Sequence, residues 1–466
     1  IVTARNDVLV NALADKDIET YTISGGVGVA GLAMSVSVWS IGQGIEKNYS
    51  DNSGRTDNAT ENNDGASVDG DTARQSETAT GQMTTLLSAN GSQPQRARTI
   101  TSDASATIAS EGPKQAAINA KISTKPATKG TEAYIESGTT VTAGDDIEVR
   151  ADEHAVFTEL VGGVGAGLVG VGAGISVTSL HLNTSAHAGG VLTAGGDIIV
   201  RERMNESVHV TGYVGAAGFV GLGASVVVVK DDSVQEAYIA DGSQIVNAAN
   251  VDISTDSTRV LSGRTGMVAA GAVGAGASFA RVTVYNDSAV ENRAYVGAGT
   301  LIGQSASGTV GSLSISANED INAHADVKAL SAGIVGVGMN FAIVQVRPDL
   351  RAEIGANARI SVSGDVTVSN TAIDRAGATV VGIQAGAAAI GTSLATAGDR
   401  PIMDTVVRPA YLNAGGDITV STRHNHDGVG AVNDRGAFAT TNSSAGGALS
   451  GNGAASQATS SADMES

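Results

Sequence analysis

The sequence predicts an all-β protein: a right-handed parallel β-solenoid (β-helix) of about seven repeats of about 52 residues, with two coils per repeat and one large insertion. Three observations predict this fold. Glycine supplies 61 of the 466 residues, whereas aromatic residues are 3% and cysteine is absent. Two short motifs recur at a fixed spacing, and apolar and polar residues alternate around them as they do in strands. Few large side chains and no disulfides are therefore available for an ordinary globular core.

The first motif is an Asp followed by Ile or Val, any residue and Val. Its clear copies begin at Asp146, Asp197, Asp365 and Asp417, and degenerate copies begin at Asp7, Asn250 and Ser312. Asp, Asn and Ser all cap turns with their side chains, so one such residue at each strand entry predicts a turn role. A catalytic role is not expected, because one acid per repeat forms a row along the axis and not a converging pair.

The second motif is a run of Gly, Ala and Val that ends in a small residue, any residue, and Ser or Asn. Its last residues are Ser35, Ser176, Ser225, Ser278, Asn340 and Ser393. These residues follow the first motif by 28 positions in five copies and by 30 between Asp146 and Ser176. Such a constant distance predicts a geometrically fixed half of the repeat. The glycine-rich runs predict thin faces, where opposing sheets lie too close for larger side chains.

A third motif, Ala-Tyr followed by an aliphatic residue, precedes the first. It contains Tyr134, Tyr238, Tyr295 and Tyr411, with Ala352-Glu353-Ile354 as a weaker copy. Aromatic residues in register at a strand start are expected to stack on one another. The alternative is a platform on which sugar rings stack.

Spacing and composition divide the chain into four parts. Residues 1–43 are the first repeat, and residues 44–129 are a polar, acidic and partly mobile insertion. Residues 130–423 are continuous solenoid repeats, and residues 424–466 are a degenerate last repeat or a linker rich in Ser, Gly and Ala.

Charge and hydropathy exclude several partners. The net charge is −19, and the Lys and Arg residues do not cluster, so a nucleic-acid interface is not expected. The apolar runs are rich in glycine and lack flanking charge asymmetry and aromatic girdles, so the chain is not expected to span a membrane.

Few residues suggest a ligand site. The segment 48–71 concentrates carboxylates that suit Ca²⁺, namely Asp51, Asp57, Glu61, Asp64, Asp69 and Asp71. It does not match an EF-hand loop, because Thr60 stands where that motif needs Asp. A solvated acidic loop is therefore the expected reading. His424 and His426 form a close pair without a third ligand in the pattern, so the sequence predicts no metal, cofactor or catalytic residue.

The repeat resembles a known family at this point. Ala133-Tyr134-Ile135, the strand Ile147–Val149 and the run Val-Gly-Val-Gly-Ala-Gly-Ile-Ser-Val that ends at Val177 resemble repeats of giant bacterial surface exoproteins. These are the filamentous-haemagglutinin-like and leukotoxin-type filamentous adhesins. The resemblance covers the chain from Ile1 to about Val420. It implies a secreted or cell-anchored β-helical shaft for attachment, aggregation or filament building.

The expected function is a non-enzymatic structural and adhesive rod segment of a large extracellular bacterial adhesin or filament. Its expected partners are a host or neighbouring-cell surface, glycans, or other copies of itself. The alternative is a β-helical protein that binds or cleaves a polysaccharide. Cleavage would need two or three carboxylates from neighbouring rungs that converge in a cleft.

Overall fold

The computed structural model describes residues 1–45, 48–50, 56–58, 66–67, 123–126, 130–285, 290–305 and 308–466. These residues form strands, turns and bends and no helix, which confirms the predicted all-β class. No helix long and apolar enough to cross a membrane is therefore found in these ranges. Most of the predicted insertion, and with it its predicted mobility, lies outside the described residues.

Each repeat forms one coil of a parallel β-solenoid. β10 (Ile147–Leu180) lies beside β13 (Ile198–Asp231) in continuous parallel register, from Ile147 opposite Ile198 to Leu180 opposite Asp231. The other edge of β10 pairs in the same way with β2 (Val8–Ile41). Two coils per repeat would require parallel pairing within a repeat, and every parallel pair among the described strands joins two different repeats. The β-solenoid is confirmed, and the predicted two coils per repeat are wrong.

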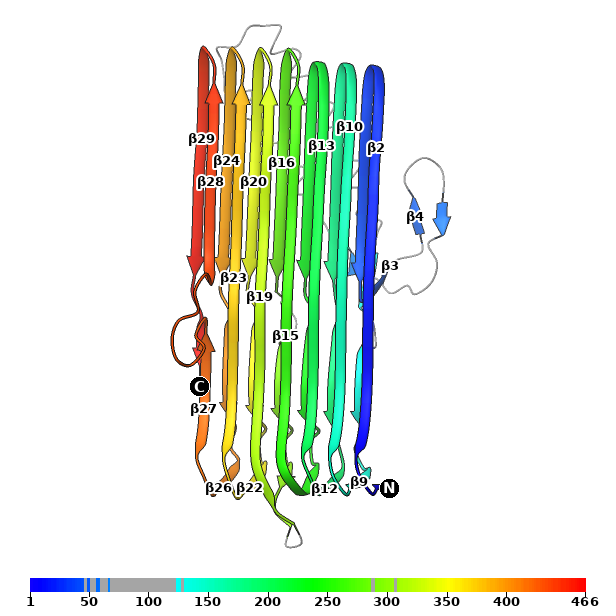
Figure 1. Cartoon of the computed structure of the whole chain (residues 1–466), viewed down its shortest axis with the longest axis vertical. Helices are drawn as coiled ribbons and strands as arrows, with labels where there is room; N and C mark the ends of the chain where they lie inside the picture. Colours follow the sequence, from blue (N-terminus) through cyan, green and yellow to red (C-terminus); the bar gives the residue numbers. More distant parts are fainter. Residues whose placement is uncertain are drawn as a thin grey trace.

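The reason is that the glycine-rich run reverses the long strand and does not begin a second coil. β15 (Gln244–Ala270) rises to one edge of the molecule, bends at Gly271 and Ala272, and returns as β16 (Val273–Val284) (Figure 1). We call this edge the tip. Each described rung has a glycine at the start of this reversal, and the series is Gly28, Gly167, Gly218, Gly271, Gly333, Gly386 and Gly447.

Rising and returning strands together make a thin two-layer blade. The rising row contains β2, β10, β13, β15, β19 (Val310–Ala332), β23 (Val366–Ala385), β27 (Ile418–His424) and β28 (Gly436–Gly446). The returning row contains the second halves of β2, β10 and β13, then β16, β20 (Val335–Val346), β24 (Ala388–Asp399) and β29 (Leu449–Ser460). Because β28 and β29 pair with β23 and β24, residues 436–460 continue the solenoid.

Two sheets of short strands close the base of each coil. One contains β8 (Thr131–Ile135), β11 (Asn183–Ala188), β14 (Val234–Ile239), β17 (Asn292–Val296), β21 (Asp349–Ile354), β25 (Ile402–Val407) and β30 (Asp463–Glu465). The other contains β1 (Val2–Ala4), β9 (Thr140–Ala143), β12 (Val191–Ala194), the start of β15, β18 (Leu301–Ile302), β22 (Arg359–Val362) and β26 (Tyr411–Ala414). Outside the solenoid lie antiparallel pairs among β3 (Gln43–Ile45), β4 (Asn48–Ser50), β5 (Thr56–Asn58), β6 (Ala66–Ser67) and β7 (Ser123–Pro126).

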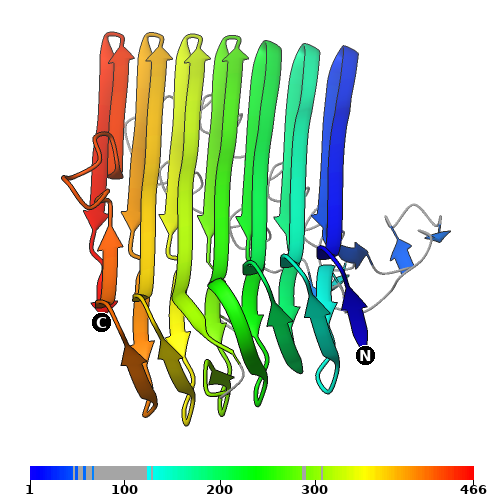
Figure 2. The ribbon, with the colours of Figure 1, turned by 60° about the horizontal axis from the view of Figure 1, so that its bottom comes forward.

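The described chain is a slab whose longest dimension runs along the strands and not along the stacking axis (Figures 1 and 2). The rising part of β10, from Ile147 to the reversal at Gly167, extends for about 65 Å at about 3.3 Å per residue. Seven rungs spaced by about 4.8 Å occupy only about 30 Å along the axis. A rod therefore requires more rungs than the described residues supply.

The interior contains two large apolar clusters. The base cluster includes Ile147, Ala186 and Leu192, contributed by the three faces of the coil. The blade cluster includes Phe157 and Leu180 from the two facing layers of β10. Between these clusters, polar and charged side chains occupy inward positions of the rising strands, the ends of the returning strands and the segments that follow them, and we call this region the polar layer.

Candidate functional site

The Asp residues of the first motif connect neighbouring rungs. The backbone N–H of Asp197 donates to Asp146 Oδ1 at 2.7 Å, and that of Asp417 donates to Asp365 Oδ1 at 2.8 Å. Asn250 continues the row by donating from Nδ2 to Asp197 Oδ1 at 2.9 Å. Each side chain thus binds the next strand entry along the stacking axis. This row is called the Asp ladder below.

The Ser and Asn residues of the second motif form a buried row in the blade. Ser225, Ser278, Asn340 and Ser393 stand beside one another in successive rungs. In β10 the residue in this row is Gly174, which lies between Ser35 and Ser225. Ser176, which the sequence placed in the row, lies two residues further on beside Ser37. The exceptional spacing of 30 residues is explained by this offset.

Aromatic rings stack along the outside of the short-strand sheet. Tyr134, His187, Tyr238 and Tyr295 come from β8, β11, β14 and β17, and their ring centroids are 5.1, 4.7 and 4.6 Å apart in turn. The guanidinium of Arg293 lies 3.9 Å from the centroid of Tyr295. This aromatic ladder matches the predicted stacking. The inner ring faces cover one another, so these rings do not present a row of free faces to sugars.

The fourth Tyr of that motif is not part of the aromatic ladder. Tyr411 belongs to β26 in the other short-strand sheet, beside Arg359. The position next to Tyr295 is taken by Glu353, whose carboxylate receives ion pairs from Arg293 and Arg408. These two arginines lower the pKa of Glu353, and its own burial opposes them.

The predicted Ca²⁺ candidates are not brought to a described site. Asp51, Glu61, Asp64, Asp69 and Asp71 lie outside the described residues, and for Asp57 the structure describes only its backbone in β5.

The polar layer contains most of the buried carboxyl groups of the described residues. Its buried carboxyl groups are Glu153, Glu202, Glu206, Asp231, Glu291, Glu319, Asp374 and Asp399. Period-2 alternation explains their position, because Glu202 and Glu206 continue the inward series of Ile198 and Val200 along β13. The alternation therefore contains a signal for inward-facing acids, although these acids belong to none of the three motifs.

Arg259 is the fully buried cation at the centre of the polar layer. Its guanidinium donates to Asp231 Oδ2 at 3.0 Å, to Glu291 Oε2 at 3.4 Å and to Gln235 Oε1 at 2.8 Å. Ser257 accepts a further bond from its Nε at 3.1 Å. Neighbouring carboxylates raise the pKa of Arg259 despite its burial, so it remains charged. Such a network stabilises the fold only while every member keeps its partner.

The other acids of the polar layer are less well compensated. Burial raises the pKa of Glu202 and Glu206 well above the ordinary value, and nearby Asp231 adds to the effect on Glu206. The carboxylate oxygens of both residues accept no hydrogen bond from the described groups. The polar layer is thus a low-dielectric region with an excess of acid, where added protons or cations are favoured.

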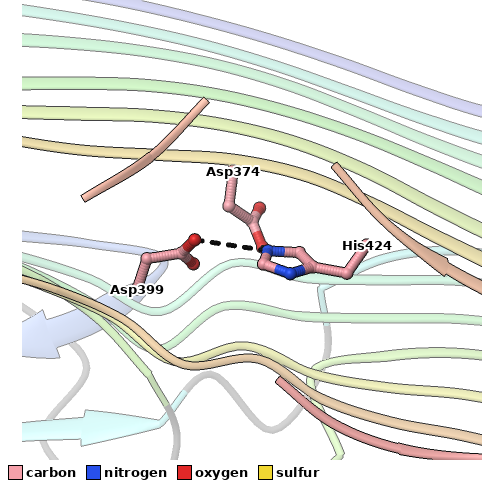
Figure 3. A group of neighbouring side chains, drawn as sticks. All are labelled: Asp374, Asp399 and His424. Atoms are coloured by element: carbon pink, nitrogen blue, oxygen red, sulfur yellow. Dashed lines mark ion pairs between the residues drawn. The ribbon is translucent and has the colours of Figure 1, made fainter. Parts of the chain in front are cut away.

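At the C-terminal end of the polar layer, three strands bring together two acids and a histidine. Asp374 of β23, Asp399 at the end of β24 and His424 at the end of β27 point toward one another (Figure 3). His424 Nε2 lies 3.3 Å from Asp399 Oδ2 and 3.8 Å from Asp374 Oδ2. Burial and the carboxylates of Glu319 and Asp399 raise the pKa of Asp374 well above its usual range.

The sequence interpretation of His424 missed this arrangement. Its partners are 50 and 25 residues away along the chain, and His426 points elsewhere, where its Nδ1 accepts the N–H of Gly428 at 2.9 Å. No local motif could indicate the cluster, because rung stacking alone brings the three side chains together.

Two grooves of different character lie on the surface of the described residues. An apolar groove of about 610 Å³ crosses the blade beside Tyr213, Val268 and Ile383. A polar groove of about 300 Å³ lies beside Tyr285, where Arg347 and Arg400 line its wall. No carboxylate lines either groove, so the acids of the polar layer do not open onto them.

Compared with known proteins, the chain matches no family model, no curated protein and no solved structure.

Proposed function

We propose that the chain is a structural and adhesive rod segment, without catalytic activity, of a large secreted or cell-surface bacterial adhesin or extracellular filament. The observation that carries the proposal is that side chains repeated in each rung contact the same position of the next rung. The Asp ladder and the aromatic ladder run along the stacking axis, and their members bind or stack on the next rung. Repeats of this kind suit a shaft that lengthens by adding rungs.

The outer edges of the terminal rungs support the extension of such a shaft. Among the described strands, β2 pairs only with β10 along the blade, and β29 pairs only with β24. An unpaired strand edge presents N–H and C=O groups that favour a further parallel strand. Additional rungs, or a second copy, would supply one.

An apolar ridge at the tip is the surface best suited to adhesion. The residue after the reversal glycine is Val29, Leu168, Phe219 or Ile334 in four rungs, and these side chains are 80%, 60%, 55% and 64% exposed. Exposed large apolar side chains that lie close together are typical of contact surfaces, and in this row Ala272 stands between Phe219 and Ile334. We call these four residues the tip ridge.

Adhesion of the purified chain to cell surfaces tests the proposal. A variant with Leu168→Ser, Phe219→Ser and Ile334→Ser is expected to lose most binding of labelled chain to cells, with an unchanged unfolding transition. Tyr411→Ser, which changes an exposed aromatic residue at the base, is the control and should bind normally. Equal binding by the tip variant would rule out the tip ridge as the adhesive surface. Failure of the unaltered chain to bind cells would rule out the adhesive function.

The insertion is tested separately. Deletion of residues 44–128 leaves the solenoid strands β8 to β29 intact in sequence. If cell or glycan binding is retained after this deletion, the insertion is not the recognition element. Scattering at increasing concentration measures assembly, and uniform single particles at all concentrations would count against end-to-end stacking.

The rival function is polysaccharide binding, and the polar groove favours it. Arg347 lies over the ring of Tyr285, with 4.9 Å between the guanidinium carbon and the ring centroid, and Arg400 lines the same groove. Paired guanidinium groups and an aromatic ring suit an acidic polysaccharide. Binding of an acidic glycan that weakens with salt and is lost in Arg400→Ala would favour this rival. Cleavage is less suited, because the acids of the polar layer are buried.

A further inference from the structure

We propose that Asp374, Asp399 and His424 form a binding site for a divalent transition-metal cation, for which Zn²⁺ is the probe. The site lies inside the solenoid at the C-terminal end of the polar layer (Figure 3). It is independent of the adhesive function proposed above.

The separations of the ligand atoms suit a single small cation. One nitrogen of His424 and one oxygen of each Asp lie within 4.8 Å of one another. Metal–ligand distances of about 2.0–2.2 Å in a tetrahedral site place neighbouring ligand atoms about 3.3–3.6 Å apart. The separations from His424 Nε2, 3.3 Å to Asp399 and 3.8 Å to Asp374, need only a small adjustment to meet this geometry.

The second observation is that three of the four buried carboxylate oxygens accept no hydrogen bond from the described residues. Asp374 has 0% exposure, and neither of its carboxylate oxygens accepts a hydrogen bond. Asp399 is also fully buried, and its Oδ1 accepts none. A buried carboxylate oxygen that accepts no hydrogen bond is costly, and a metal ion would supply the missing interaction. An acidic cluster on the surface, solvated by water, would not need one.

The nearby residues Arg259 and Arg435 already form ion pairs with other carboxylates. Arg259 binds Asp231 and Glu291, and Arg435 makes a two-point contact with Asp320 at 2.9 and 3.0 Å. The site therefore holds two carboxyl groups and one imidazole without a neutralising arginine of its own. A doubly charged cation balances two carboxylates and one neutral histidine.

Polar groups around the three ligands fix their positions. Asn425 Oδ1 accepts the backbone N–H of Asp374 at 2.7 Å, while its Nδ2 lies 3.4 Å from Asp399 Oδ2 and 3.0 Å from His424 Nε2. Ser460 donates to Asp399 Oδ2 at 3.2 Å. A cation bound between Asp399 Oδ2 and His424 Nε2 would replace the two contacts of Asn425 Nδ2, while Asn425 Oδ1 keeps its hydrogen bond with the N–H of Asp374. Asn425 has a positive φ of 51°, which Asn tolerates better than most residues.

The donor set selects the class of cation. Imidazole nitrogen favours Zn²⁺ and related first-row ions, whereas Ca²⁺ and Mg²⁺ prefer sites made of oxygen alone. Three protein ligands also leave one tetrahedral position for water. Entry is possible from the C-terminal side, because His424 is partly exposed and the segment 425–435 that follows it lies on the surface.

Calorimetric titration of Zn²⁺ into the whole chain tests the site, with visible absorption of bound Co²⁺ as a second readout. One ion per chain is expected, together with an increase in the melting temperature. Asp374→Asn and His424→Gln should each weaken Zn²⁺ binding by more than about a hundredfold and abolish the tetrahedral Co²⁺ spectrum. Asp374→Asn removes a buried charge at nearly constant shape, so the metal-free variant should melt no lower than the unaltered chain.

The control uses a second carboxylate cluster, at the surface. Asp7, Asp145 and Asp146 also lie within 4.8 Å of one another, but all are partly or fully exposed. Asp145→Asn should leave Zn²⁺ affinity and stoichiometry unchanged. Absence of Zn²⁺ binding, binding that survives both Asp374→Asn and His424→Gln, or an equal loss in Asp145→Asn would each overturn the proposal.

Discussion

Gly218 at the tip lies so close to the carbonyl oxygen of Gly167 in the preceding rung that a Cβ atom on Gly218 would overlap it. The same relationship joins the reversal glycines of the other rungs, from Gly28 to Gly447. The obstacle is backbone, which cannot move aside as a side chain does. One glycine per rung is therefore a condition for the long strand to turn back while it stays in register with its neighbour.

Gly218→Ala is expected to lower the free energy of unfolding by about 1–3 kcal/mol, because the added methyl must displace backbone. Denaturant unfolding followed by circular dichroism measures the change. Gly451→Ala in β29 is the matched control, since a Cβ there meets nothing within 4 Å. The control should be neutral or slightly stabilising, and an equal loss in both variants would contradict the tip explanation.

The Asp ladder predicts a difference between two substitutions at one position. Asp146→Ala removes the acceptor for the N–H of Asp197 and is expected to cost about 0.5–1.5 kcal/mol. Asp146→Asn keeps an acceptor oxygen and should be nearly neutral, in line with the Asn that stands in the same row at Asn250. Thermal melting of the two variants compares them, and an equal loss would show that charge matters more than the hydrogen bond.

The polar layer predicts that part of the stability decreases as the pH rises. Glu202 and Glu206 face Glu153, Asp231 and Arg259, and burial raises the pKa of both in the folded chain. The folded state therefore retains protons that the unfolded state releases above a pH of about 4.3. This contribution to the free energy of unfolding falls as the pH rises from that value through the folded pKa.

Glu206→Gln tests whether this contribution to the free energy of unfolding falls as the pH rises. The variant should raise the free energy of unfolding by about 1–3 kcal/mol at pH 8 and by less at pH 5, because a neutral amide replaces a carboxylate that is costly to ionise. The pH dependence of the difference between the two proteins isolates this group from the other carboxylates. The exposed Glu136→Gln serves as control and should show no such trend.

The aromatic ladder predicts that stability depends on having a flat ring at position 187 and not on that ring being a histidine. His187 stacks between Tyr134 and Tyr238, so His187→Ala removes two stacking contacts and should cost about 1–3 kcal/mol. His187→Tyr continues the series of tyrosines and should retain most of the stability. Urea unfolding measures both, and equal losses would show that stacking does not stabilise the base.

Much of the fold followed from local pattern. Turn-capping side chains at Asp146, Asp197 and Asn250 marked strand entries, because their hydrogen bonds repeat with the rung. Stacking of Tyr134, Tyr238 and Tyr295 followed from their shared motif. Tyr411 has the same motif but lies in the other short-strand sheet. The difference arises because a short motif does not determine which face of the coil its strand joins.

The sequence by itself determined the repeat, the inward and outward faces of each strand and the thinness of the blade. These properties depend on spacing and on the alternation of side chains within one strand. Only the tertiary structure decided that one repeat makes one coil, because the same glycine-rich run is compatible with a turn or with a new strand. It also decided that Asp374, Asp399 and His424 meet. The reason is that strand alternation specifies which side chains point inward, while the stacking and reversal of the rungs decide what those side chains face across the core.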